Sequence, residues 1–170
     1  TQMGMNNYHI AGLNICSDFK LSFASEISPT DQIDVHIKSV DDVSSDEPII
    51  FQCHDAKASE TTIWFQGADD LQFAVQGGQT IFVAAADHYT ADDISLYING
   101  SGMGAIALQR GRVPFHISGV QMGDKMIAIS GESGAGKSTL AALLAKRGLA
   151  HFTDDVGVVK PKDDPLMVLP

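Results

Sequence analysis

A glycine-rich octapeptide at residues 131–138, GESGAGKS, constrains this chain more than any other feature. It matches the pattern G-x-x-x-x-G-K-[ST] at every fixed position, and the apolar run KMIAIS precedes it. Glycines let successive backbone N–H groups surround phosphate oxygens, and a helix that begins at such a loop adds its positive dipole end. The pattern predicts a strand, a phosphate-binding loop and a helix, in that order. A chance glycine-rich turn is the alternative.

Each polar position of the loop has an expected role. Lys137 is expected to reach the β- and γ-phosphates of a nucleoside triphosphate, and the Ser138 hydroxyl is expected to coordinate Mg²⁺. Thr139 would cap or pack at the start of the helix. We therefore predict ATP and Mg²⁺ as cofactors. The residues predicted to bind them are Gly131, Glu132, Ser133, Gly134, Ala135, Gly136, Lys137, Ser138 and Thr139.

An acidic pair, Asp154 and Asp155, lies at the centre of the strand-like run 151–159. The carboxyl ends of strands in α/β proteins gather around a ligand, so this position favours a functional pair. One carboxylate can hold the metal or its water shell, and the other can accept a hydroxyl proton, because neighbouring like charges raise the proton affinity of one member. A solvated acidic turn is the alternative, since a similar pair occurs at 163–164 in an evident loop.

The first 90 residues are predicted to form a small, mostly antiparallel β domain. Apolar and polar residues largely alternate over 8–16 and 33–40, which is typical of half-buried strands. Four more strand-like runs follow, separated by segments whose Gly and Asp content suits turns: IIFQC (49–53), TTIWF (61–65), LQFAV (71–75) and TIFVAA (80–85).

Residues 91–170 are predicted to form the domain that contains the phosphate-binding loop. A helix is expected over 91–110, with Gly111 as its stop. Three glycines within it (100, 102 and 104) each cost about 1 kcal/mol relative to Ala, and close packing against a neighbour would account for them. The runs 113–121 and 125–130 are expected to form a hairpin. An amphipathic helix follows the loop, with Leu140, Leu143, Leu144 and Arg147 at helical spacing and Gly148 as its stop.

Composition excludes several classes of function. Residues 1–100 hold 3 of the 11 basic and 15 of the 21 acidic side chains, which disfavours binding to nucleic acid or to an anionic membrane. No apolar run approaches the roughly 18 residues of a membrane span, so we expect a cytoplasmic protein. Cys16 and Cys53 lack the spacing of a metal or redox site and are expected to be buried, inert thiols.

The arrangement of these motifs resembles the HPr kinase/phosphorylase family and the wider group of HPr-kinase-like serine kinases. The resemblance covers roughly residues 91–160. Its parts are the Gln109-Arg110-Gly111 segment, a strand bearing His116, a hairpin, the loop GESGAGKS, the helix that ends in Lys146-Arg147-Gly148, and the pair Asp154-Asp155. The opening YHIAGL also looks like the amino-terminal domain of these relatives.

This resemblance implies an α/β fold in which a P-loop kinase-type core follows a small β domain. It implies that Asp154 is the base at an acceptor serine, that Asp155 is the metal-side carboxylate, and that His116 supports the base or lies near the phosphates. From the residues alone, a structural role for His116 stays open. The implied activity is ATP-dependent phosphoryl transfer to a serine of a protein or peptide. The family's tendency to assemble is consistent with a homo-oligomer.

The sequence differs from the family's pattern in two ways, and these differences limit which of the family's activities can be expected here. Thr139 stands where the bifunctional enzymes have Glu, and the chain stops at Pro170, before their downstream signature. Dephosphorylation, HPr as substrate and the completeness of the second domain are therefore open. Relatives with a small sheet domain ahead of a GKST loop include kinases that tailor ribosomally made peptides, such as lasso precursors. A peptide or protein serine is the predicted acceptor.

Other functions remain open from the sequence. A nucleotide hydrolase or a small-molecule kinase would use the same loop with a different acceptor. A non-catalytic regulatory module would bind nucleotide without turning it over. The acidic amino-terminal part is either a solvated surface or a docking surface for a basic peptide.

Overall fold

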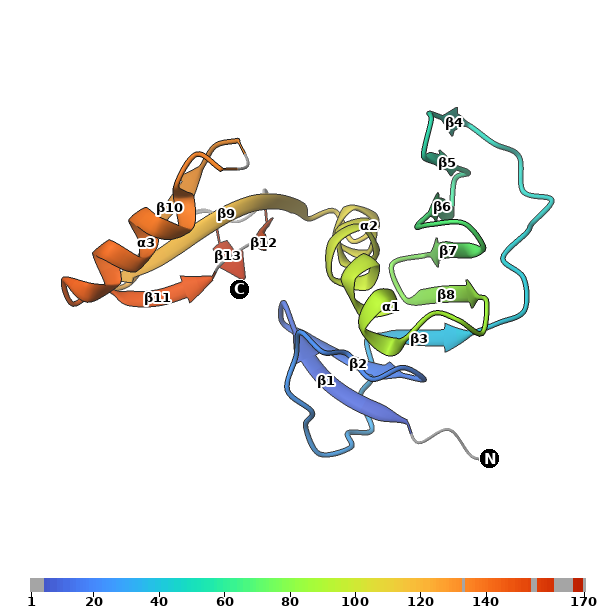
Figure 1. Ribbon diagram of the computed structural model, residues 1–170, viewed down its shortest axis with the longest axis horizontal. Coiled ribbons are helices and arrows are strands. Elements are labelled where there is room, and N and C mark those ends of the chain that lie inside the picture. Colours follow the sequence, from blue (N-terminus) through green and yellow to red (C-terminus); the bar gives the residue numbers. More distant parts are fainter. Residues whose placement is uncertain (1–4, 133, 154–155, 161–166, 170) are drawn as a thin grey trace. The chain divides into compact units, whose positions relative to one another are not determined.

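The computed structural model describes residues 5–132, 134–153, 156–160 and 167–169, and it is a mixed α/β structure (Figure 1). The chain divides into two compact units, Thr1–Arg110 and Gly111–Pro170. Each unit contains its own sheet. In the described ranges, no helix is long and apolar enough to cross a membrane.

An eight-stranded sheet of order β1-β2-β3-β8-β7-β6-β5-β4 forms the first unit. Strand β3 runs parallel to both of its neighbours, β2 and β8, and all other neighbours are antiparallel, as expected for this part of the chain. The strands are β1 (Asn6–Ile10), β2 (Leu13–Ser17), β3 (Val35–Ser39), β4 (Phe51–Gln52), β5 (Ala56–Ala58), β6 (Thr62–Gln66), β7 (Leu71–Gln76) and β8 (Thr80–Ala85).

The run 8–16, predicted as a strand, is a hairpin. Ala11 and Gly12 connect β1 to β2 and both have positive φ, 50° and 73°. Two consecutive residues in this region form the turn whose twist matches that of paired strands. The apolar residues shift from positions 8 and 10 to positions 13 and 15 across the turn, a break that the prediction of one strand overlooked. Strand β5 was also missed, because its three residues lie in a segment typical of turns.

A helical segment covers one face of this sheet (Figure 1). It consists of α1 (Ala91–Tyr97), one turn of π-helix (Ile98–Gly102) and α2 (Met103–Gln109). Thr90 and Asp93 form a capping box at its start. Its buried residues share one core with strands β7 and β8: Ile94, Ile98, Met103, Ala105 and Ile106 pack with Leu71, Phe73, Val75, Ile81 and Val83.

The boundary between the units follows this helical segment and lies between Arg110 and Gly111, later than the expected position at residue 90. Polar contacts add to the apolar packing. The Gln109 side chain donates to the carbonyl oxygens of Thr61 and Val75 at 3.0 and 2.9 Å. Arg110 Nη1 donates to the Gly78 carbonyl at 2.7 Å. The helices therefore belong to the acidic amino-terminal unit.

Close packing accounts for one of the three helix glycines. A Cβ at Gly102 would lie 3.3 Å from Ile81 Cδ1, which is tighter than an ordinary contact. A Cβ at Gly100 or Gly104 would meet nothing within 4 Å. Of the three, only Gly102 lies where an added Cβ would crowd the sheet.

The second unit is built on a sheet of order β10-β9-β12-β13, and β11 also pairs with β9. Its strands are β9 (Val113–Met122), β10 (Lys125–Ser130), β11 (Ala150–Thr153), β12 (Val156–Lys160) and β13 (Met167–Leu169). All of the described pairings are antiparallel. The predicted hairpin of β9 and β10 is confirmed, with Gly123 at φ 66° in its turn. Strand β9 is the common partner of β10, β11 and β12.

Helix α3 (Lys137–Lys146) follows the glycine-rich loop, as predicted. Gly148 ends it with a φ of 100°, and the Gly148 N–H donates to the Ala145 carbonyl at 3.0 Å. The predicted apolar face is wrong, however. Leu140 and Leu143 are 47% and 54% exposed, whereas Ala141 is buried. The buried apolar position of α3 is therefore a small residue.

Candidate phosphate-binding site

The glycine-rich octapeptide connects β10 to α3, which is the strand, loop and helix order that its pattern predicts. Gly134 and Gly136 have φ values of 80° and 85°, in the left-handed region that favours glycine. A Cβ at either position would meet nothing within 4 Å. The backbone conformation, rather than crowding, therefore requires glycine here, and open space lies beside the loop at both positions.

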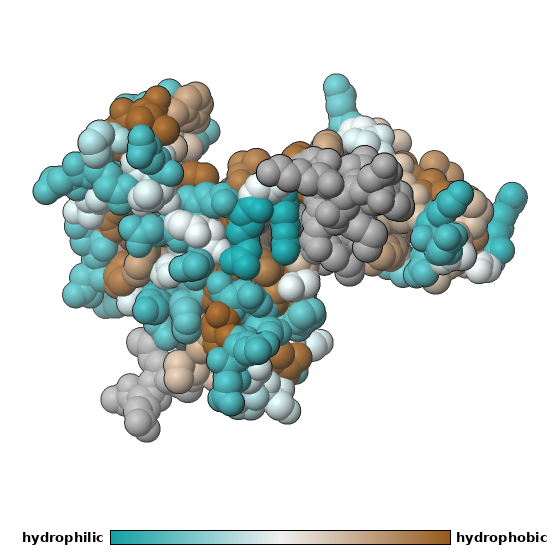
Figure 2. All heavy atoms as spheres, turned by 180° about the vertical axis from the view of Figure 1, so that it is seen from behind, coloured by the Kyte–Doolittle hydropathy of each residue, from teal (hydrophilic) through white to brown (hydrophobic). Residues whose placement is uncertain are grey.

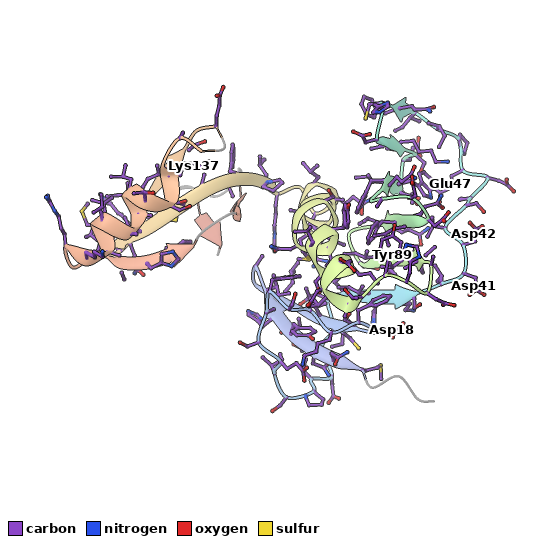
Figure 3. All side chains as sticks on the ribbon, in the orientation of Figure 1. Asp18, Asp41, Asp42, Glu47, Tyr89 and Lys137 are labelled. Carbon is purple, nitrogen blue, oxygen red and sulfur yellow. The ribbon has the colours of Figure 1, made fainter. Side chains whose placement is uncertain are left out.

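Lys137, the first residue of α3, is folded against this loop (Figure 3). Its side chain is buried, and Nζ donates to the carbonyl oxygens of Gly131 at 3.0 Å and Glu132 at 2.9 Å. A buried ammonium group requires such partners, because burying an unpaired charge is costly. The loop therefore holds a positive charge where an incoming anion would meet it.

The N-terminus of α3 lies at the same place. Its N-cap is Gly136, no side chain of the described residues caps it, and its first turn contains no acidic residue. Unsatisfied N–H groups and the positive end of the helix dipole favour an anion at such an end. Together with the Lys137 ammonium and the Ser138 hydroxyl, they form a set of hydrogen-bond donors that fits the oxygens of an anion such as phosphate.

Ser118 is a site residue that the sequence analysis missed. It lies in β9, is 1% exposed, and its Oγ is 3.4 Å from Ser138 Oγ. The register explains this proximity, because Ser118 pairs with Ile129, two residues before the loop begins. A small polar residue in an apolar strand was the only signal in the sequence. Its nearness to Ser138 depends on strand pairing, which local patterns do not report.

Several predicted site residues fall outside the described residues. These are Ser133, Asp154 and Asp155. The residues that flank the acidic pair are described: Thr153 of β11 pairs with Gly119, and Val156 of β12 pairs with His116. Both partners lie in β9, on either side of Ser118. The structure thus describes the backbone of His116 but not its side chain. The remaining loop residues that were predicted to bind nucleotide are exposed: Gly131, Glu132, Gly134, Ala135, Gly136, Ser138 and Thr139.

The two cysteines differ from each other. Cys16 in β2 is buried as expected, and burial raises the pKa of its thiol. Cys53 was also expected to be buried, but it is exposed just after β4. Its strand-like context was correct; the strand lies at the edge of the sheet, where side chains remain open to solvent.

No protein-family model matches the chain. Comparison with curated proteins found no match, and comparison with solved structures found none either. A functional proposal for this chain therefore rests on the residues of the loop and on the resemblance that the sequence itself carries.

Proposed function

We propose that this protein transfers the γ-phosphoryl group of ATP to a serine hydroxyl of a protein or peptide, as in the HPr-kinase-like serine kinases that its sequence resembles. The observation that carries the proposal is the placement of Lys137. Its buried ammonium is held by loop carbonyls beside the N-terminus of α3, which no side chain of the described residues caps. In this proposal the second unit is the P-loop part of a kinase-type core, and it acts in the cytoplasm.

The loop residues would bind the triphosphate. Lys137 would exchange its two carbonyl partners for phosphate oxygens, and backbone N–H groups of the loop and of the first helical turn would donate to the same oxygens. The Ser138 hydroxyl would hold Mg²⁺. When bound, this ion neutralises charge that develops on the phosphoryl oxygens.

Asp154 is the proposed base. It would take the proton of the acceptor serine as the serine oxygen bonds to the γ-phosphorus. The bond from that phosphorus to the bridging oxygen breaks, and phosphoserine and ADP are the products. Asp155 would contribute to the metal site, and His116 would support the base. The register supports these roles, because the neighbours of the acidic pair, Thr153 and Val156, are aligned with β9 around Ser118.

Two variants test the proposal. Lys137→Ala should abolish transfer and weaken ATP binding, since removing one such charge-stabilising donor typically costs about 100-fold or more in rate. Asp154→Asn should lower transfer by about 10²- to 10⁴-fold, the usual contribution of a general base, and leave ATP binding nearly intact. Binding is measured by calorimetry and transfer by labelled phosphate on serine.

Lys146→Ala is the matched control, because Lys146 is an exposed lysine at the far end of the same helix. This substitution should leave ATP binding and phosphoryl transfer unchanged. Unaltered transfer by Asp154→Asn would refute the base assignment. Phosphate release without a peptide would identify a hydrolase. Transfer of phosphate to a metabolite would identify a small-molecule kinase, and ATP binding without turnover would identify a regulatory module.

A further inference from the structure

The outermost strand of the first unit, β4, presents an apolar edge. Ile49, Ile50 and Phe51 are 42%, 66% and 60% exposed. The Ile50 N–H donates to the Ala58 carbonyl at 2.8 Å, so the segment is held to β5 on one side. Sheet edges in natural proteins are normally protected by charged residues, proline or a covering segment. Here Pro48 comes just before the edge, and the three residues that follow it are apolar and exposed. In Figure 2 this edge is the brown patch at the upper left.

A groove of about 590 Å³ opens beside the same edge. Gln52 and Cys53 line it from β4 and the residue after it, and Trp64 and Phe65 line it from β6. Peptides that add a strand to a sheet edge gain affinity from backbone hydrogen bonds and specificity from pockets for their side chains. The edge and the groove together provide both requirements.

The segment just before the edge is strongly acidic. It contains Asp41, Asp42, Asp46 and Glu47 and no basic residue. Hydrogen bonds fix it to the sheet. Glu47 accepts the hydroxyls of Thr61 at 2.8 Å and Thr62 at 2.9 Å, next to β5 and β6 (Figure 3). Trp64 Nε1 donates to the Val43 carbonyl at 2.8 Å. The segment is therefore a positioned part of this surface.

One carboxylate that lies close to the apolar edge faces solvent without a partner. Asp46 is exposed and, within the part of the chain that the structure describes, makes no hydrogen bond or ion pair. Asp41, by contrast, follows β3, five positions from β4 in the sheet order (Figure 3). The chain from Asp46 to Phe51 spans no more than about 18 Å, so negative charge stays near the apolar edge. The whole unit holds 4 of the 11 basic and 15 of the 21 acidic side chains. A second copy of the chain would bring the same charges and be repelled.

We infer that the β4 edge binds an extended segment of another protein in which apolar, strand-forming residues are interspersed with lysine or arginine. The segment adds to the sheet beside β4. Its apolar side chains contact Ile50 and Phe51 and enter the groove, and its basic side chains face Asp46 and Glu47. Where this segment belongs to the phosphorylated protein, a role that rests on the proposed function, the first unit is the substrate-docking unit.

Selection from a displayed library of random ten-residue peptides, with the full chain as bait and no nucleotide present, tests this inference. The expected result is enrichment of peptides that combine Lys or Arg with Val, Ile or aromatic residues. Affinity for one enriched peptide should fall at least tenfold in Phe51→Lys or Ile50→Lys and should decrease as salt is raised. Both side chains are exposed, so the melting temperature should change little.

Leu96→Lys is the matched control, because Leu96 is equally apolar and 71% exposed, but lies on α1. It should bind the peptide like the wild type. Failure of enrichment, enrichment of acidic peptides, or equal loss in Leu96→Lys would overturn the inference. So would a dimer that Ile50→Lys dissociates, as measured by sedimentation, because the occupant would then be a second copy. Peptide binding should persist in Lys137→Ala, which separates this result from a failure of the proposed kinase activity.

Discussion

At the scale of single residues, Lys137 connects the described structure to the proposed chemistry. Its ammonium already has two carbonyl partners, so its burial needs no ligand. Exchange of these neutral acceptors for anionic phosphate oxygens strengthens the bonds, since donor and acceptor are then both charged. The positive charge that an anion would pair with is thus already in place at the loop.

Ser118 is expected to position the Ser138 hydroxyl, the proposed ligand of Mg²⁺. Loss of one such hydrogen bond corresponds to about 0.5–1.5 kcal/mol. Ser118→Ala should therefore raise the Mg²⁺ concentration for half-maximal transfer by about three- to tenfold and leave the rate at saturating Mg²⁺ near that of the wild type. A Mg²⁺ titration of transfer measures both. Ser130→Ala, at an exposed serine in β10, is the control. A lower saturating rate with an unchanged Mg²⁺ requirement would contradict this role.

Glu47 makes the stability of the first unit depend on pH. Hydroxyl groups of Ser59, Thr61 and Thr62 donate to its carboxylate and lower its pKa. The stabilisation is therefore complete above the ordinary glutamate pKa of about 4.3 and is lost as the pH falls through the lower folded-state value. Wild type should resist urea better than Glu47→Gln at pH 7, and this difference should shrink toward pH 3. A difference that is independent of pH would contradict the assignment.

At the scale of elements, periodicity predicted most strands and both helical segments, because a period depends only on neighbouring residues. The features that periodicity missed depend on which residues pack or pair with each other in the fold. Leu140 and Leu143 have helical spacing, yet they are exposed, and the buried residues of α3 are Lys137 and Ala141. For the site, the octapeptide was enough to predict the loop, whereas the nearness of Ser118 to Ser138 required the register of β9 and β10.

The helix glycines offer a matched pair of substitutions. Gly104→Ala places its Cβ in open space and should stabilise the first unit by about 0.5–1 kcal/mol, the usual difference between Ala and Gly in a helix. Gly102→Ala gains the same propensity but forces Ile81 to shift, so its free energy of unfolding should not exceed that of the wild type. Urea denaturation measures both. Equal stabilisation by the two substitutions would show that the helix does not approach β8 closely.

At the scale of the whole molecule, the unit boundary after Arg110 predicts which fragment folds. Residues 1–110 should melt cooperatively by circular dichroism. Residues 1–90 should not, because they lack the buried side chains of Ile94, Ile98, Met103 and Ile106. Each contributes about 1.5–3 kcal/mol, which together is comparable to the stability of a typical domain. Cooperative melting of 1–90 at the same temperature would place the boundary before the helices.

The central claim is transfer of phosphate from ATP to serine, and one incubation tests it most directly. The purified chain is mixed with γ-labelled ATP, Mg²⁺, a panel of serine-containing peptides and an HPr-type carrier protein, and the label is followed by gel and mass. The account predicts label on a serine of a peptide or protein with wild type and none with Lys137→Ala. ATP that binds without any label reaching a serine would contradict it.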